Sequence, residues 1–197
     1  MMHINGIILA AGLSSRMGEN KLRLPFRGKP ILRHVIDLAA ALPLASVILV
    51  SREETVADMR LPDNVELVIN PDPAQGQSSS LRLGLARADG DGYLFFQGDQ
   101  PLLDAATVGR VLALADCDSI VIPTHAGVPG NPVFFPANCR EALMAVIGDR
   151  GGRAVREARP NACRYVEIPA PEPLLDVDTP EQYAALAARE LPPVFRW

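Results

Sequence analysis

Short apolar runs alternate with helical patterns along most of the chain, and this alternation constrains the fold more than any other feature. Continuous apolar runs, the pattern of strands buried on both faces, lie at residues 6–9, 46–50, 65–69, 93–97, 119–122, 133–135 and 163–168. Helical spacing or helix-boundary residues lie between them, at residues 30–42, 78–88, 104–115, 138–147, 151–158 and 180–190. Strands that alternate with helices predict an α/β domain with a mostly parallel sheet.

Prolines and capping residues mark the expected ends of these elements. Proline makes up 18 of the 197 residues, and most prolines stand singly between predicted elements. Pro43 and Pro123 are predicted to stop the helix and the strand that precede them. Asp104 and the serines at 78–80 are expected to cap the helices that they begin. No linker, internal repeat or low-complexity block divides the sequence, so residues 1–197 are expected to form one domain.

The charge is small overall and uneven along the chain. A formal net charge of −4 argues against a non-specific nucleic-acid binder. The first 35 residues nevertheless hold six basic residues and one acid, a local charge of +5. This segment suits a compact anion such as a triphosphate, or else it forms a solvated face. Only two of the 19 basic residues are lysines, Lys21 and Lys29, which suggests positions where a compact ammonium is needed.

Cysteine usage and hydropathy indicate the compartment. Cys117, Cys139 and Cys163 are far apart and form no Cys-x-x-Cys or Cys/His cluster, so neither a zinc site nor a disulfide framework is expected. A reduced, cytoplasmic chain is the simplest interpretation. No apolar run approaches the ~18 residues of a membrane span. The apolar start also lacks the basic segment of a signal peptide.

A loop rich in small residues follows the first predicted strand. Gly12, Ser14, Ser15, Arg16 and Lys21 lie within ten residues there. Small residues let backbone N–H groups approach phosphate oxygens, and the two cations add charge. The loop is neither a Walker A motif nor a G-x-G-x-x-G fingerprint, because the spacing of its glycines differs from both. Taken alone, the pattern fits either a phosphate-binding loop at the carboxyl edge of the sheet or a flexible strand-to-helix turn.

The same stretch, Leu-Ala-Ala-Gly-x-Ser-x-Arg-Met-Gly-x-x-Lys at residues 9–21, resembles the signature of nucleotidyltransferases. Five later motifs agree with it in order and spacing, at residues 76–85, 98–102, 130–133, 148–152 and 176–181. Together they resemble the molybdenum cofactor cytidylyltransferase (MocA-like) group within the MobA-like nucleotidyltransferase family, over residues 5–183. The resemblance implies a Rossmann-like, three-layer αβα nucleotidyltransferase domain with a mostly parallel mixed sheet.

The resemblance also implies roles for the motif residues. The nucleotide would contact Leu9, Ala10, Ala11, Gly12, Ser14, Ser15, Arg16, Lys21, Gly76 and Ser80, and the catalytic residues would be Arg16, Lys21 and Asp99. Gly76 and Ser80 would lie against the base. Ala11 favours cytosine, because guanylyl-transferring relatives tend to carry Gly at this position. The acceptor would lie against Asn131, Arg150 and Arg153, unless the two arginines are simply solvated.

Two carboxylates in the motifs suggest a metal ion. Asp99 follows a predicted strand, and a carboxylate beside a triphosphate is repulsive unless a cation such as Mg²⁺ lies between them. The resemblance implies that Asp99 and Asp178 hold this Mg²⁺, or alternatively Mn²⁺, with Asp176 as the weaker choice. Without the resemblance, Asp99 would be read as a turn residue. Asp178 or Thr179 would then be the N-cap of the helix that starts at Pro180.

The reaction implied is Mg²⁺-dependent transfer of a cytidylyl group from CTP to the phosphate of the molybdopterin-molybdenum cofactor, with release of pyrophosphate. A phosphate monoester is largely dianionic at neutral pH and needs no general base. The alternatives are GTP or another nucleotide, a sugar or alcohol phosphate as acceptor, delivery of the finished cofactor to a molybdoenzyme, or a non-catalytic relative. The expected partners are therefore small molecules and, transiently, a molybdoenzyme of xanthine dehydrogenase type. Neither nucleic acid nor a membrane is expected.

Overall fold

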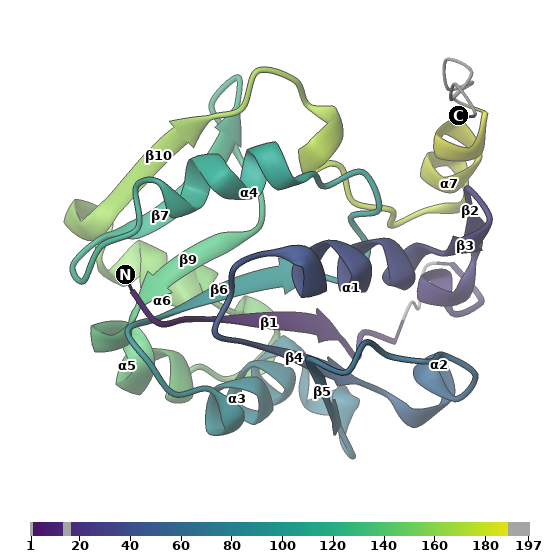
Figure 1. The fold of residues 1–197 in the computed structure, drawn as a ribbon, viewed down its shortest axis with the longest axis horizontal. Coiled ribbons are helices and arrows are strands. Elements are labelled where there is room, and N and C mark those ends of the chain that lie inside the picture. Colours follow the sequence, from purple (N-terminus) through teal and green to yellow (C-terminus); the bar gives the residue numbers. More distant parts are fainter. Residues whose placement is uncertain (1, 14–16, 189–197) are drawn as a thin grey trace.

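An eight-stranded mixed sheet forms the centre of the molecule within residues 2–13 and 17–188, which the computed structural model describes (Figure 1). Along the sheet the strands follow the order β10 (Cys163–Glu167), β7 (Ile120–His125), β9 (Val133–Pro136), β6 (Gly92–Gln97), β1 (Ile4–Ala10), β4 (Ser46–Ser51) and β5 (Val65–Ile69), and β8 (Val128–Pro129) pairs with β7. β9 is antiparallel to β6 and β7, and β8 to β7, whereas the other pairs are parallel. The predicted mostly parallel mixed sheet is confirmed.

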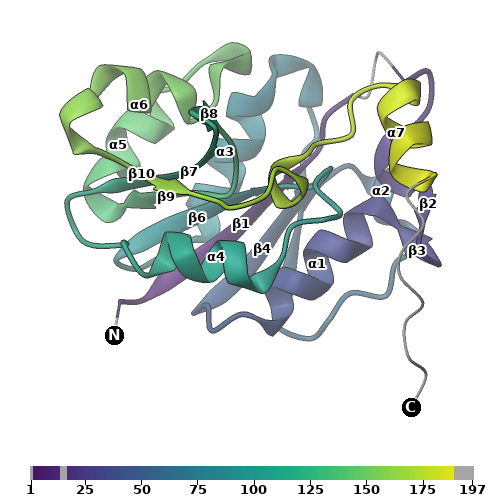
Figure 2. The same cartoon turned by 90° about the horizontal axis from the view of Figure 1, so that it is seen from above.

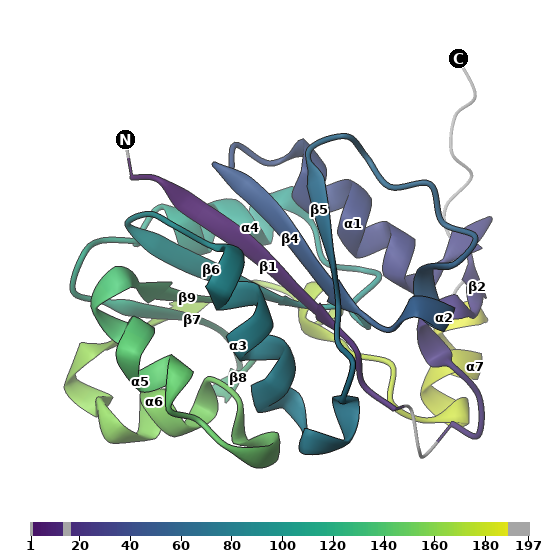
Figure 3. The ribbon, with the colours of Figure 1, turned by 90° about the horizontal axis from the view of Figure 1, so that it is seen from below.

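Helices cover both faces of the sheet, which gives the three layers seen in Figure 2. One face carries α1 (Ile31–Ala41) and α4 (Ala105–Leu112), and the other carries α3 (Gln77–Arg87), α5 (Arg140–Met144) and α6 (Arg153–Ala158). At the edge where β1 ends lie α2 (Glu53–Val56), α7 (Pro180–Ala187) and a small antiparallel pair, β2 (Pro25–Phe26) and β3 (Lys29–Pro30) (Figure 3). The Rossmann-like αβα architecture is therefore confirmed.

Two separate apolar clusters hold the layers together. Successive side chains of a strand point to opposite faces of the sheet. Ile8 of β1 and Phe96 of β6 accordingly belong to the cluster under α1 and α4. Ile7 and Phe95 belong to the cluster under α3, α5 and α6. Burial on both faces is the reason why the central strands are continuous apolar runs in the sequence.

The strand order reverses at β1, and this reversal positions the functional site. The chain adds β4 and β5 on one side of β1, then returns to place β6 on its other side. These strands are parallel, so their carboxyl ends share one edge, where Leu9 of β1 lies opposite Val50 of β4 and Gln97 of β6. Ligands of open α/β sheets bind outside the carboxyl ends at such a reversal.

The two outermost strands differ from the expected pattern of burial on both faces. In β5, Leu67 and Ile69 are exposed, and in β10 Tyr165 is 62% exposed. Both strands lie at the ends of the sheet, where helices cover it incompletely (Figure 3). The prediction of continuous burial is therefore wrong for the edges and correct for the centre.

Pro123 does not end its strand, contrary to the sequence prediction. β7 continues through it to His125. The carbonyl of Pro123 accepts a hydrogen bond of 2.8 Å from the Gly130 N–H. In a strand, the backbone N and C=O groups of one residue point to the same side. On that side of Pro123 lies the loop residue Gly130, so no neighbouring strand needs an N–H from Pro123. A missing N–H is therefore tolerated here.

Helix caps follow the sequence prediction in one case and differ from it in another. Asp104 caps α4 by accepting a hydrogen bond of 2.7 Å from the Thr107 N–H, as predicted. The serines at 78–80 lie inside the first turn of α3 and do not cap it; Gly76 is its N-cap residue. The helix predicted at 138–147 is also shorter, since a 3₁₀ turn (Ala137–Cys139) precedes α5.

Candidate active site

A cleft of about 420 Å³, here called the first cavity, opens at the carboxyl ends of β1 and β6. Its walls include seven of the residues predicted to bind the nucleotide: Leu9, Ala10, Ala11, Gly12, Lys21, Gly76 and Ser80. The other three, Ser14, Ser15 and Arg16, lie outside the described residues. Asp99 and Asp178 also line this cavity. With Asp149, which also lines this cavity, the structure brings together residues from five of the sequence motifs.

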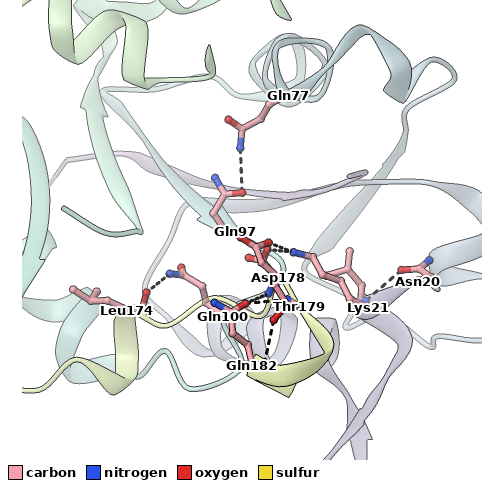
Figure 4. A network of polar contacts seen from close by, with 11 residues as sticks. Asn20, Lys21, Gln77, Gln97, Gln100, Leu174, Asp178, Thr179 and Gln182 are labelled. Carbon is pink, nitrogen blue, oxygen red and sulfur yellow. Dashed lines mark hydrogen bonds and ion pairs between the residues drawn. The ribbon is translucent and has the colours of Figure 1, made fainter. Parts of the chain in front are cut away.

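Lys21 lies between the two carboxylates that the sequence assigns to a metal. Its Nζ is 2.6 Å from Asp99 Oδ2 and 2.7 Å from Asp178 Oδ1 (Figure 4). Lys21 comes from a 3₁₀ turn (Lys21–Arg23), Asp99 follows β6 and Asp178 precedes α7. Burial disfavours the ammonium, but the two carboxylates outweigh this effect and raise the pKa of Lys21 above its usual range. The cation is therefore fully charged at neutral pH.

Backbone contacts fix the separation of the two carboxylates. The Val177 N–H donates to the carbonyl of Asp99 at 3.1 Å, and Val177 is buried. The amide of Gln100 donates to the carbonyl of Leu174 at 3.1 Å (Figure 4). Thr179, rather than Asp178, is the N-cap of α7 and forms a capping box with Gln182. The carboxylate of Asp178 is consequently available to Lys21 instead of being used to cap the helix.

The donor set fits a hard divalent cation. Asp99 Oδ1 is buried, and no atom of the described residues forms a hydrogen bond with it. No group of three or more His, Cys, Asp or Glu residues that could hold a metal occurs in the described chain. Two carboxylates complemented by substrate phosphates are, however, the arrangement that Mg²⁺ commonly uses in proteins.

Asp176 is placed differently from Asp178. It is an exposed residue and lines a second cavity rather than the first. Surrounding protein atoms, and then the negative charges of Asp99 and Asp178, raise the pKa of the Asp176 carboxyl. Asp99 and Asp178 both line the first cavity and Asp176 does not, which makes these two the better candidates for metal ligands.

The far end of the first cavity is formed around the start of α3. Buried Asn70 donates from its amide to Ser79 Oγ at 2.8 Å and to Ser80 Oγ at 3.0 Å. The N–H of Gln77 donates to Asp149 Oδ1 at 3.1 Å, so a residue 72 positions away satisfies the helix terminus. Neither Asn70 nor Asp149 was among the site residues predicted from the sequence. Two features of the sequence could have pointed to them: Asn70 directly follows the strand that ends at Ile69, and Asp149 lies inside the motif at residues 148–152.

A second cavity of about 290 Å³ adjoins the first. Its walls include all three residues predicted to contact the acceptor, Asn131, Arg150 and Arg153. Arg150 and Arg153 form ion pairs with Glu157 at 2.6 and 2.8 Å. Arg156, which the sequence analysis did not select, lines the same cavity. Arg150 and Arg153 share one carboxylate, so the three arginines keep a net positive charge at this cavity, which suits an anionic ligand.

Most of the basic N-terminal segment does not face the first cavity. Lys29 and Arg33 pair with Asp37 on the surface, and Arg23 pairs with Asp58 at 2.8 Å. The expectation that this +5 segment meets a triphosphate is therefore wrong for these residues, because they lie outside the walls of the first cavity and pair with Asp37 and Asp58 instead. Among the described basic residues of the segment, Lys21 alone lines the cavity.

Comparison with known proteins agrees with this geometry. The model of the MobA-like NTP transferase domain matches residues 6–163. The chain belongs to this MobA-like family. It is accordingly an enzyme of the nucleotidyltransferase class, as the sequence motifs predicted.

Three curated relatives extend over nearly the whole MobA-like chain. The molybdenum cofactor cytidylyltransferase of Escherichia coli is 30% identical over 96% of this chain and 98% of its own. The purine catabolism protein PucB of Bacillus subtilis is 30% identical, with coverage of 92% and 94%. A probable molybdenum cofactor guanylyltransferase of Nostoc is 28% identical, with coverage of 94% and 91%.

Solved structures share the fold of this MobA-like domain. Rv0371c from Mycobacterium tuberculosis superposes with a TM-score of 0.86 at 29% identity, covering 94% of this chain and 97% of that one. A structure of the same protein in complex with manganese gives a TM-score of 0.82 at 27% identity, with coverage of 95% and 100%. Among the described residues, no helix is long and apolar enough to cross a membrane.

Proposed function

We propose that this nucleotidyltransferase transfers CMP from CTP to the terminal phosphate of the molybdenum cofactor. The observation that carries the proposal is the meeting of two cavities beside a paired Lys21, Asp99 and Asp178. One cavity suits the nucleotide and the other, with its arginines, suits a phosphate-bearing acceptor. Relatives that share nearly the full length carry molybdenum cofactor cytidylyltransferase and guanylyltransferase names.

The choice of CTP over GTP rests on the wall of the first cavity. Identities of 30% and 28% to a cytidylyltransferase and a guanylyltransferase do not separate the two nucleotides. Ala11 is buried in the wall of this cavity, where its methyl group occupies space that a glycine would leave open. A smaller base fits this narrower wall, which supports cytosine. GTP as the preferred donor is the competing outcome.

The transfer joins two phosphates and needs no proton removal. An oxygen of the acceptor phosphate attacks the α-phosphorus of CTP, and the bond from that phosphorus to the bridging oxygen breaks. Pyrophosphate leaves with the electron pair. The acceptor monoester has a second pKa near ~6 and is mostly dianionic at neutral pH. The described walls of both cavities contain no histidine, which agrees with this chemistry.

Catalysis then depends on alignment and on neutralisation of charge. The ammonium of Lys21, with backbone N–H groups of the loop after β1, stabilises the phosphates of the donor and the departing pyrophosphate. Arg16 is assigned the same role from the sequence motif. Asp99 and Asp178 would hold Mg²⁺ or Mn²⁺, which would supply Lewis-acid stabilisation of phosphate charge when bound. Asn131, Arg150 and Arg153 would hold the acceptor.

The proposal includes a cytoplasmic location and a recipient for the product. The three cysteines are free thiols, which suits a reducing compartment such as the cytoplasm. A molybdoenzyme of xanthine dehydrogenase type would then receive the cytosine dinucleotide form of the cofactor.

Turnover with defined substrates tests the proposal. The full chain is incubated with Mg²⁺ or Mn²⁺, molybdenum-loaded cofactor and each of the four nucleoside triphosphates in turn, and both pyrophosphate and the dinucleotide product are measured. Product formation with CTP is the expected result. Product with GTP alone would revise the nucleotide, and product only with a sugar or alcohol phosphate would revise the acceptor. Cofactor binding without pyrophosphate release would favour a delivery protein.

A further inference from the structure

The two cavities share only part of their walls, and the shared part marks where the substrates must meet. Leu9, Gln77, Gln97 and Asp99 line both cavities. Leu9 has an apolar side chain, and Asp99 is paired with Lys21. The two glutamines are therefore the uncharged polar groups at this junction.

Gln97 is positioned by the centre of the sheet. It is the last residue of β6, and its Cα pairs with Leu9 of β1 in the parallel ladder. Its Oε1 accepts a hydrogen bond of 3.2 Å from Gln77 Nε2 (Figure 4). No described residue accepts a hydrogen bond from Gln97 Nε2, whereas Oε1 of the same amide is used by Gln77. Two N–H donors are thus available to a ligand at the junction.

Gln77 is itself fixed by the loop that carries the acceptor-side arginines. It is the first residue of α3, and its backbone N–H donates to Asp149. Gly151 packs so closely on its side chain that a Cβ at position 151 would lie 2.0 Å from Gln77 Oε1. With its oxygen against Gly151, Gln77 presents Nε2 to Gln97.

We propose that Gln97 is a catalytic residue that donates from Nε2 to the phosphoryl group in transfer, and that Gln77 is a positioning residue that orients it. The inference rests on the proposed nucleotidyl transfer. During transfer, negative charge spreads over the equatorial oxygens of the α-phosphorus, while its bond to the acceptor oxygen forms and its bond to pyrophosphate breaks. A preorganised neutral donor stabilises this charge. Lys21 supplies positive charge from the nucleotide side.

Three methionine variants of the full chain test the inference, because methionine keeps the length of glutamine and removes its amide. Q97M is expected to lower kcat about 100-fold, the usual effect of losing one such donor, with the KM for CTP within about threefold of wild type. Q77M frees the Gln97 amide to adopt both orientations, so kcat falls about 2- to 10-fold. Q75M is the matched control, since Gln75 lines neither cavity, and its kcat is unchanged.

The double variant separates positioning from simple packing. If Gln77 acts through Gln97, Q77M/Q97M turns over no more slowly than Q97M alone. Independent, additive losses would overturn the positioning role. A folded Q97M with kcat within twofold of wild type, judged by an unchanged thermal midpoint, would overturn the catalytic role while the proposed function stands. Absence of turnover by the wild type with every nucleotide would overturn the proposed function and this inference with it.

Discussion

The hydroxyl of Tyr183 donates a hydrogen bond of 2.7 Å to the carbonyl of Pro25, a residue 158 positions earlier in the chain. Tyr183 belongs to α7, which begins directly after Asp178 and Thr179, and Pro25 lies four residues after Lys21. The bond therefore connects the two segments that carry Lys21 and Asp178. It is one of the contacts that keep these groups at ion-pair distance.

Removal of the Tyr183 hydroxyl is expected to loosen the contact between α7 and the segment that follows Lys21. Tyr183→Phe should lower the free energy of unfolding by about 0.5–1.5 kcal/mol, the usual net value of one hydrogen bond. Turnover should fall while the nucleotide still binds, because the position of Asp178 becomes less defined. Denaturant unfolding and steady-state kinetics measure the two effects. Full activity in a destabilised variant would show that the bond contributes to stability alone.

The two lysines of the chain provide a matched pair for the cation at the site. Lys21→Met should lower kcat about 100-fold or more, because the charge facing the phosphates is lost. Lys29→Met removes the same group from a surface ion pair with Asp37 and should leave kcat unchanged. Equal effects of the two substitutions would contradict the assignment of Lys21. Circular dichroism checks that both variants fold.

The metal assignment predicts a difference between three carboxylates. Asp99→Asn and Asp178→Asn should each abolish the thermal stabilisation that Mn²⁺ gives the wild type and lower pyrophosphate release by orders of magnitude. Asp176→Asn, on the wall of the second cavity, should retain the Mn²⁺ effect. Excess chelator should stop turnover by the wild type. Near-normal pyrophosphate release by Asp99→Asn would eliminate the proposed metal site.

Alanine substitutions at Gly76, which lines the first cavity, and at Gly127, which does not, compare the cost of positive φ with the added cost of a steric clash. Both have positive φ, of +84° and +80°, but a Cβ at Gly76 would lie 2.4 Å from Asp149 Oδ1, whereas Gly127 has open space. Each alanine substitution should destabilise the fold by about 1–3 kcal/mol, because positive φ is unfavourable for a residue with a Cβ and Gly76, with ψ −174°, lies in a region that is essentially restricted to glycine. Gly76→Ala should lose about 1–3 kcal/mol more from the clash, and should also bind CTP more weakly. Calorimetry of unfolding and of CTP binding measures both.

Asp37 should contribute stability that depends on pH. Burial alone would raise its pKa, but hydrogen bonds and charge from Lys29 and Arg33 lower the pKa below its usual range. The stabilisation is thus fully present above the pKa of the unfolded chain, near 3.8, and is lost as the pH falls through the lower pKa of the folded state. Asp37→Asn should be less stable than wild type at pH 6, and the difference should vanish in acid. A pH-independent difference would contradict this origin.

The sequence predicted the central strands well because burial on both faces leaves a continuous apolar pattern. It failed at the edges and at Pro123, where the outcome depends on which neighbour lies alongside. Glu66 in β5 is compatible with a strand because that strand is at the end of the sheet. The side on which Pro123 lacks an N–H faces Gly130. The residues around Pro123 in the sequence do not reveal that Gly130 lies there.

The candidate site was predictable to the extent that its residues lie in motifs at strand ends. Lys21 and Asp99 lie in motifs that follow strands, whereas Asp178 precedes a helix and was selected, like the metal role of Asp99, from the family resemblance; the structure brings all three into contact. Gln77, Gln97 and Asn70 were not selected, because an amide gives no signal until its partner is known. Arg23 and Arg33 illustrate the opposite error, since only the structure shows which carboxylates already neutralise them.

The position of Asp178 near the end of the described chain has a consequence for biosynthesis. The first cavity takes most of its walls from the segment between Leu9 and Asp99, whereas Asp178 arrives only after the whole sheet has been translated. A nascent chain therefore contains Lys21 and Asp99 before it contains the second carboxylate. Val177, and Leu186 of α7, are buried in the apolar cluster under α1 and α4, so termination before Val177 should remove the second carboxylate and part of the core together.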